Sequence, residues 1–182
     1  MTAILFWDID GTLLTTGRAG VFAWQDALRE MTGTDVDLMS SLRTAGLTDH
    51  QIAKQILASL AAPEGEAHVD RLVGRYEALL PAALPRRQGR VLDGVREALE
   101  FLHTARPDVV SYLLTGNTRA GALAKLTHYG LAGYFADGAF SRDAGDRASI
   151  AREDRLSTAS RTSTSTQTRE TLPPKSAATV SA

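Results

Sequence analysis

The sequence predicts an α/β fold, in which a doubly wound parallel sheet carries an all-helical block after its first strand. Two apolar runs, residues 3–7 and 109–114, have the length of buried strands, and each ends in polar residues. Residues 16–88, between the two runs, carry apolar side chains at helical spacing. Helices that alternate with such strands are typical of parallel sheets, whose sites form at the carboxyl ends of the strands. We therefore expect the polar residues that end the two strands to share one crevice.

Length and composition narrow the class of protein. The 182 residues suit one domain, or one core with a small insertion. The lack of cysteine excludes disulfides, zinc fingers, iron–sulfur clusters and thiol nucleophiles. A net charge of −1 argues against a nucleic-acid partner or a membrane surface, and no stretch approaches the roughly 18 apolar residues of a membrane-spanning helix. We therefore expect a cytoplasmic protein.

The first strand is expected at residues 3–7, because a continuous apolar run with β-branched and aromatic members suits a strand buried on both faces. In the block that follows, apolar side chains recur three and four positions apart in three groups. The groups are Val21, Trp24, Leu28 and Met31; Ile52, Ile56, Leu57 and Leu60; and Leu72, Tyr76, Leu79 and Leu80. Glycine and proline residues separate the groups, so residues 16–88 are expected to form a small helical module.

A second α/β stretch follows the helical block. The pattern predicts a helix over residues 94–104 and a strand over residues 109–114. The polar loop 115–117 then opens a helix over residues 118–129, which Gly130 ends.

The carboxyl-terminal part has a different composition. Serine and threonine dominate residues 157–171, and such a segment cannot fill a core. We expect residues 151–182 to be a disordered or degenerate tail. The expected division is therefore an α/β core of residues 1–15 and 89–150, a helical insertion of residues 16–88, and this tail.

Two carboxylates, Asp8 and Asp10, follow the first predicted strand. One can face a reacting centre while the other leaves the strand in a turn that Gly11 permits. A strand-end aspartate is a competent nucleophile toward phosphorus when a hard divalent cation and oriented donors offset the charge repulsion. A second acid can protonate the leaving oxygen and later activate water. The alternative is an Asx-type turn with no chemistry.

These motifs resemble the haloacid dehalogenase-like (HAD) hydrolases. Residues 8–13, Asp-Ile-Asp-Gly-Thr-Leu, match the DxDGT signature of that superfamily, and residues 112–117 match its second motif, a hydrophobic strand that ends in Ser or Thr. The helical block has the position of a C1-type cap, as in phosphoglycolate phosphatase-like members. The resemblance covers roughly residues 1–140. It implies a Rossmann-like core and a Mg²⁺-dependent phosphatase that acts on a small phosphorylated metabolite.

The resemblance also implies roles for individual residues. Asp8 is similar to the nucleophile that forms an aspartyl-phosphate, and Asp10 is similar to the general acid/base. The Asp8 carboxylate and the Asp10 backbone carbonyl would bind Mg²⁺. Thr115, with Gly116 and Asn117 at the start of the following helix, would hold the phosphoryl group. Because Asp10 is present, phosphatase or phosphotransfer chemistry fits better than dehalogenation.

The stretch from Arg43 to Asp49 is similar to the Gly-x-Thr-Asp loop by which C1 caps approach the substrate. On that resemblance, Arg43 and Thr48 would touch the leaving group. The alternative is structural, since Thr48 or Asp49 could serve as the amino-terminal cap of the helix that follows.

A cation is also expected near the phosphate. Lys125 is similar to the third-motif cation of the family, although a solvated surface lysine is an equally good interpretation of a residue two turns into a helix. Arg147 is a second candidate. The four histidines share no metal-ligand spacing, so surface or helix-face roles are expected for them.

The acidic pair of the family's fourth motif, Gly-Asp-x-x-x-Asp, is not found. Residues 173–180 are similar to the segment that leads into the strand bearing this motif, and Asp143 and Asp146 lie in an expected loop. The first strand would then have an unpaired edge. The alternative function is therefore a truncated, catalytically impaired remnant or a non-enzymatic interaction protein. A metal-binding DxD of glycosyltransferase type fits the position of the motif poorly.

Overall fold

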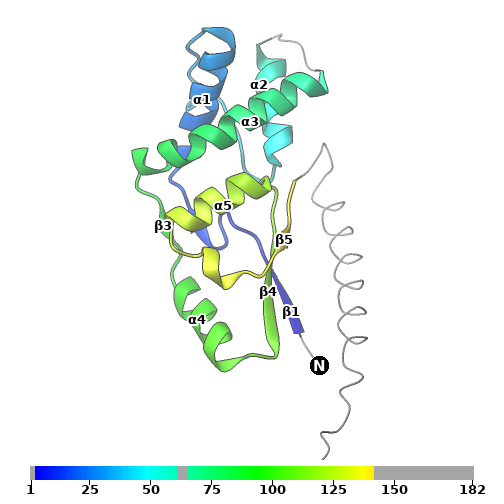
Figure 1. Ribbon diagram of the computed structural model, residues 1–182. Helices are drawn as coiled ribbons and strands as arrows, with labels where there is room; N and C mark the ends of the chain where they lie inside the picture. Colours follow the sequence, from blue (N-terminus) through cyan, green and yellow to red (C-terminus); the bar gives the residue numbers. More distant parts are fainter. Residues whose placement is uncertain (1–2, 61–64, 142–182) are drawn as a thin grey trace, which may run out of the picture.

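The computed structural model describes residues 3–60 and 65–141 (Figure 1). Its main sheet is parallel and has the strand order β1 (Ala3–Trp7), β4 (Val109–Leu114), β5 (Gly138–Ala139). Ala3 lies opposite Val109, and Trp7 lies opposite Leu113. The polar residues that follow β1 and β4 consequently meet at one edge of the sheet. This arrangement confirms the predicted α/β fold class.

Two helices and one short turn cover this sheet. They are α4 (Val95–Ala105), α5 (Arg119–His128) and the 3₁₀ turn η2 (Ala132–Tyr134). Leu99 of α4 and Leu126 of α5 pack with Leu113 of β4 in one apolar cluster. The apolar spacing of both helices predicts this packing, because residues three and four apart share one face of a helix.

One expectation about β1 is wrong. The continuous apolar run predicts that Leu5 and Phe6 are buried, yet they are 40% and 42% exposed. Within the described part of the chain, β1 pairs with β4 along one side and with no strand along the other. A strand buried on both faces needs neighbours and covering layers around it, and the sequence of the strand does not specify those.

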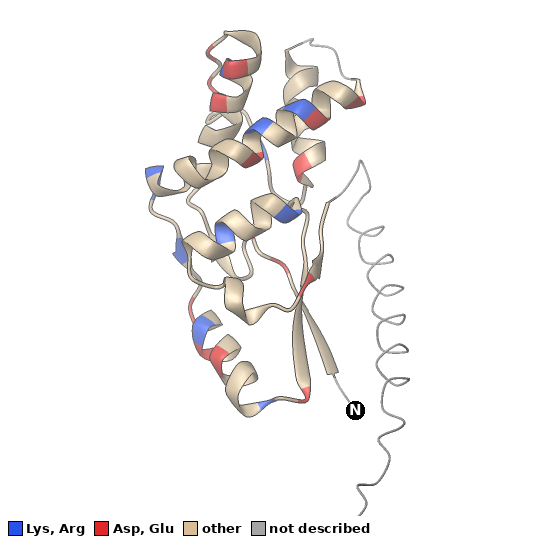
Figure 2. Ribbon diagram, viewed as in Figure 1, with Lys and Arg blue, Asp and Glu red and all other residues tan. Residues whose placement is uncertain are grey.

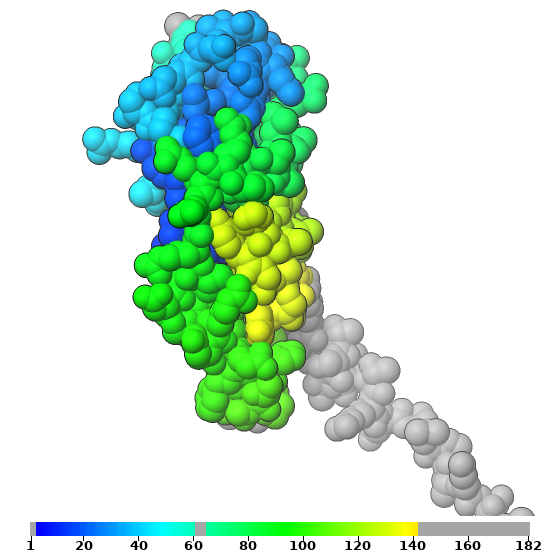
Figure 3. All heavy atoms as spheres, turned by 90° about the vertical axis from the view of Figure 1, so that its left-hand side faces the viewer, coloured from blue at the N-terminus to red at the C-terminus, as the bar shows by residue number. Residues whose placement is uncertain are grey.

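The intervening residues form a helical module, residues 19–86. It consists of α1 (Ala19–Thr32), α2 (Asp49–Ser59), α3 (Glu66–Ala83) and the turn η1 (Leu84–Arg86), and it packs around an apolar cluster of its own. At its centre Trp24 stacks on Tyr76, with the ring centroids 3.8 Å apart and the planes 4° apart. The space-filling view shows this module seated on the α/β part of the molecule (Figure 3).

Two crossings connect the module to the sheet. The chain leaves the core through β2 (Leu14–Thr15) and returns through β3 (Arg90–Val91), and these strands pair antiparallel. Helix α3 also packs against α5. The β2–β3 pair and the contact between α3 and α5 therefore hold the helical module over the carboxyl ends of β1 and β4.

Charges of both signs are distributed over the helices, as Figure 2 shows for α1, α3 and α4. None of the helices in residues 3–60 and 65–141 has the length and apolarity needed to cross a membrane. The expected tail, residues 151–182, lies outside the described residues. Asp143, Asp146 and Arg147 also lie outside them.

Candidate active site

The site begins where β1 ends. Asp8 follows the strand directly, and its Oδ1 accepts a hydrogen bond of 2.8 Å from the N–H of Ile9. Gly11 then adopts φ +82°, a left-handed conformation that glycine adopts without a steric penalty, and its N–H donates to the carbonyl of Leu14. This turn places both Asp8 and Asp10 on the wall of one cavity.

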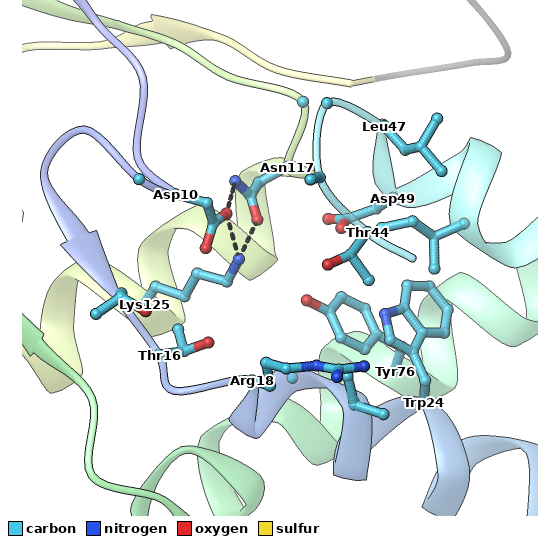
Figure 4. A pocket seen from close by; sticks show the side chains of 18 of the residues that line it. Asp10, Thr16, Arg18, Trp24, Thr44, Leu47, Asp49, Tyr76, Asn117 and Lys125 are labelled. Carbon is cyan, nitrogen blue, oxygen red and sulfur yellow. Dashed lines mark hydrogen bonds and ion pairs between the residues drawn. The ribbon is translucent and has the colours of Figure 1, made fainter. Parts of the chain in front are cut away.

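Three side chains form a closed polar network at that wall (Figure 4). Lys125 Nζ lies 2.6 Å from Asp10 Oδ2 and 2.6 Å from Asn117 Oδ1. Asn117 Nδ2 donates to the same Asp10 oxygen at 2.9 Å. Lys125 is 6% exposed, so its interpretation as a solvated surface lysine is wrong. A buried ammonium needs such partners, because desolvation of an unpaired charge is costly.

The turn after β4 supplies the next part of the site. Gly116 and Asn117 line the cavity, whereas Thr115 is not among the residues that line it. Thr115 is buried, and its Oγ1 accepts 2.7 Å from Asn117 Nδ2 and 3.3 Å from the Asn117 N–H. Thr115 thereby orients Asn117. The side chain of Thr118 then caps α5 by accepting from the N–H of Gly121.

The cavity has a volume of about 350 Å³ and two chemically different ends. Figure 4 shows Asp10 and Lys125 at one end. Apolar side chains of the helical module, Trp24 and Leu47, lie at the other end. A cavity of this size suits a small molecule that is polar at one end.

A loop of the module approaches the turn after β4 very closely. Asp49 N–H donates to the Gly116 carbonyl at 2.9 Å, and Asp49 Oδ2 accepts from Thr118 N–H at 2.8 Å. A Cβ on Gly116 would lie 2.9 Å from the carbonyl oxygen of Leu47, so only glycine fits there without a shift of the backbone. Burial raises the pKa of Asp49 to about 6, although nearby Lys125 favours the ionised form.

The two residues of this loop that the resemblance assigns to the leaving group do not line the cavity. Arg43 is exposed, and Thr48 is buried. Thr48 caps α2 in a capping box: its side chain accepts from the Gln51 N–H, and Gln51 Oε1 accepts from the Thr48 N–H. The structural interpretation of Thr48 is therefore confirmed.

Other residues line the side of the cavity that faces the helical module. The cavity is lined from this side by Thr44 and Asp49, by Tyr76, and by Arg18, whose Nη2 donates to the Leu42 carbonyl at 3.0 Å. Arg18 has φ +67°, the one positive φ of a non-glycine residue in the described chain. A non-glycine residue in this conformation carries a steric penalty and is enriched at functional sites. The sequence offered a signal for Asp49 alone, in the Gly-x-Thr-Asp pattern.

The donors that could hold a metal ion are few and chemically suitable. Magnesium is commonly bound through one or two carboxylates, together with water and substrate phosphate oxygens. Asp8 and the main chain of Asp10 offer hard oxygen donors beside the cavity. Among residues 3–60 and 65–141, no group of three or more His, Cys, Asp or Glu residues is placed to hold a metal. The donors present fit a hard cation that takes few ligands from the protein.

The fold and this site together define a class of protein, the haloacid dehalogenase-like hydrolases. The chain belongs to this family, whose model matches residues 5–161. The probable phosphatase IndB of Dickeya dadantii (strain 3937) is 32% identical over 136 residues, which are 74% of this chain and 57% of IndB. The chain thus spans little more than half the length of this curated relative.

Solved structures share this fold. A predicted phosphatase from Clostridium acetobutylicum superposes with a TM-score of 0.62 at 18% identity, over 87% of this chain and 71% of that one. CbbY from Rhodobacter sphaeroides, solved in complex with phosphate, gives a TM-score of 0.56 at 14% identity, over 80% of this chain and 67% of that one. At these identities the likeness is one of fold.

Proposed function

We propose that the protein is a Mg²⁺-dependent phosphatase that hydrolyses a small phosphate monoester through an aspartyl-phosphate. The observation that carries this proposal is the network of Lys125, Asp10 and Asn117, which shares one cavity wall with Asp8. A cation, an amide and two carboxylates at one end of a small cavity match the needs of phosphoryl transfer. The family, and the curated relative's name as a probable phosphatase, support it.

The reaction has two steps. In the first, a carboxylate oxygen of Asp8 forms a bond to phosphorus while the bond from phosphorus to the leaving oxygen breaks. Asp10 gives its proton to that oxygen, so the leaving group departs as an alcohol. In the second step, water attacks the phosphorus of the aspartyl-phosphate and Asp10 takes up the water's proton. Inorganic phosphate leaves and the Asp8 carboxylate is restored.

Other residues hold the phosphoryl group during both steps. Lys125 supplies a positive charge, and the N–H groups of the turn at Gly116 supply donors, while the Asn117 amide positions Lys125 and Asp10. Thr115 acts through Asn117, which it orients. Asp8 and the Asp10 carbonyl would hold Mg²⁺, which when bound offsets the repulsion between the Asp8 carboxylate and the phosphate.

The helical module would act as the cap of this site. In this proposal residues 1–15 and 89–150 form the catalytic core, and residues 16–88 form a cap that closes over the cavity. The hydrogen bonds from Asp49 N–H to Gly116 and from Thr118 N–H to Asp49 support such a role, because they join the module to the turn that would bind phosphate. Such closure excludes water from the reacting groups.

The test is hydrolysis of p-nitrophenyl phosphate with Mg²⁺. We expect turnover that EDTA abolishes and that Asp8→Asn reduces to background. Asp35→Asn, a change at a side chain that is 83% exposed and does not line the cavity, is the matched control and should retain the activity. Turnover that persists in Asp8→Asn would refute the proposal. Calorimetric titration with Mg²⁺ separates it from the alternative of a non-enzymatic interaction protein, which has no need to bind the ion.

A further inference from the structure

The wall of the cavity that faces Lys125 carries three oxygen-bearing side chains that the proposed phosphatase chemistry does not use. Figure 4 shows the carboxylate of Asp49, the hydroxyl of Thr44 and the hydroxyl of Tyr76 pointing into the cavity, toward the network around Lys125. Asp49 is 4% exposed and Tyr76 is 2% exposed. We call these three residues the cap wall.

Asp49 limits what can occupy the space beside it. Its Oδ2 accepts from the Thr118 N–H, and among the described residues no second hydrogen bond to its carboxylate is found. An ionised carboxylate accepts hydrogen bonds and donates none. A group that settles against Asp49 must therefore bring an O–H or N–H donor, because an unsatisfied buried carboxylate oxygen is costly.

Tyr76 adds a group that can both donate and accept. Burial holds the pKa of its hydroxyl well above the usual range, so the hydroxyl keeps its proton. The ring is fixed by its stacking on Trp24, and in the part of the chain that the structure describes the hydroxyl has no hydrogen-bond partner. Thr44 presents a second hydroxyl on the same wall. Because the Tyr76 ring is fixed, its hydroxyl positions a ligand without the entropy cost of ordering a longer side chain.

We propose that the cap wall recognises hydroxyl groups on the leaving alcohol, so that the substrates are phosphate esters of small polyhydroxy alcohols, such as sugar or polyol phosphates. This inference rests on the proposed phosphatase function. A hydroxyl can donate to Asp49 while it accepts from Tyr76 or Thr44. The cavity, at about 350 Å³, has room for a phosphate and a leaving group of a few carbons.

Two other classes of leaving group fit less well. A carboxylate, as in 2-phosphoglycolate, could pair with Arg18, but it brings no donor for Asp49 and adds a like charge beside it. An ammonium, as in phosphoethanolamine, can donate to Asp49 but would be repelled by the charges of Lys125 and Arg18, which line the same cavity. The cap wall therefore favours a neutral, hydroxyl-bearing group.

The experiment compares substrates that differ in this one respect. Glycerol 3-phosphate and propyl phosphate differ by two hydroxyl groups, and we expect kcat/KM to be at least about tenfold higher for glycerol 3-phosphate. Asp49→Asn and Tyr76→Phe should each reduce that ratio by about fivefold to tenfold, because the first replaces a charge-assisted hydrogen bond by a neutral one and the second removes a hydrogen bond, while both keep the shape. Glu66→Gln, an exposed acid at the start of α3 that does not line this cavity, is the matched control and should keep the ratio.

Other outcomes overturn the inference. One is a wild-type kcat/KM that is nearly equal for glycerol 3-phosphate and propyl phosphate. Another is a preference for 2-phosphoglycolate or phosphoethanolamine. The third is a loss of kcat/KM in the variants by the same factor for both esters. If the protein hydrolyses none of these esters, the proposed function fails, and calorimetric binding of glycerol 3-phosphate and propyl phosphate in EDTA still tests the cap wall. The inference is supported if the wild type binds glycerol 3-phosphate more tightly than propyl phosphate and if both variants bind glycerol 3-phosphate more weakly. Equal binding of the two esters by the wild type refutes it.

Discussion

Lys125 and Asp10 are separated by 115 positions in the chain, yet the lysine Nζ lies 2.6 Å from the aspartate Oδ2. Parallel pairing brings the end of β1 beside the end of β4, and α5, which Thr118 caps, then places Lys125 over that edge. The pair connects the first motif of the sequence with the helix after the second motif. It also places a buried positive charge at the end of the cavity where a phosphate would lie.

Replacement of this charge should abolish most activity. We expect Lys125→Met to lower kcat/KM for p-nitrophenyl phosphate by about 10²- to 10³-fold, because one preorganised donor to the transferring group is lost. The matched control is Lys54→Met on α2, outside the cavity lining, which should stay within about twofold. A Lys125→Met protein with near wild-type activity would show that Asp10 and Asn117 suffice without the cation.

Asn117 offers a sharper test, because its amide donates to Asp10 and accepts from Lys125. Asn117→Ala removes both bonds, whereas Asn117→Asp puts a second carboxylate 2.9 Å from the position of the Asp10 oxygen. We expect Asn117→Asp to be the worse variant by about tenfold in kcat/KM, since like charges at this distance oppose each other. Equal activities of the two variants would mean that the second carboxylate costs nothing beyond the loss of the amide.

The contact between Gly116 and Leu47 should be intolerant of a single methyl group. Gly116→Ala would place a Cβ 2.9 Å from a backbone carbonyl, and we expect a loss of about 1–3 kcal/mol in the free energy of unfolding, measured with urea. The control is Gly74→Ala in the middle of α3, where a Cβ meets nothing within 4 Å. That variant should gain about 0.5–1 kcal/mol. A neutral Gly116→Ala would show that the loop around Leu47 moves aside at little cost.

Asp49 should make stability depend on pH in a recognisable way. Its pKa is about 6 in the folded protein, against 3.8 for the unperturbed group, so between pH 4 and pH 6 the folded state binds more protons than the unfolded state. Its contribution to stability is therefore complete below about pH 4 and is lost as the pH rises through 6. The Asp49→Asn variant would lack this dependence, because its amide does not titrate.

The corresponding measurement is urea unfolding of the wild type and of Asp49→Asn across this range. The stability of Asp49→Asn relative to the wild type should rise by up to about 3 kcal/mol between pH 4 and pH 7, at about 1.4 kcal/mol for each pH unit between the two pKa values. Asparagine can still accept the Thr118 hydrogen bond, so the comparison isolates the charge. A difference that stays constant with pH would place the ionisation of Asp49 outside this range.

The strands and the aspartate pair could be predicted from the sequence because their signals are local. An apolar run followed by Asp8 and Asp10 needs no tertiary information to be recognised, and the strand at Val109–Leu114 has the predicted bounds. Lys125 is ambiguous in the sequence. Helical spacing gives its position along α5, but whether that face of the helix meets Asp10 or solvent depends on how α5 packs over the sheet.

The side of the site formed by the helical module is harder to predict for the same reason. The spacing of Trp24 and Tyr76 indicates the buried face of a helix, but it does not say that the Tyr76 hydroxyl emerges at a cavity. At the start of α2, Thr48 and Asp49 are both good helix-capping residues. Their opposite roles, one capping α2 and the other reaching Thr118 of α5, follow from the packing of the module against the core.

The parallel pairing of β1 with β4 also bears on the order in which the protein folds. Trp7 Nε1 donates to Ser111 Oγ across 104 positions, so this pair can form only after a very long loop closes, whereas the contacts between α1 and α3 are far more local. We expect the helical module to fold first and the pairing of β1 with β4 to form later. The chain's two tryptophans lie in separate apolar clusters, Trp24 in the module and Trp7 against the sheet. Stopped-flow fluorescence of Trp7→Phe and Trp24→Phe would thus time the two events separately within one protein.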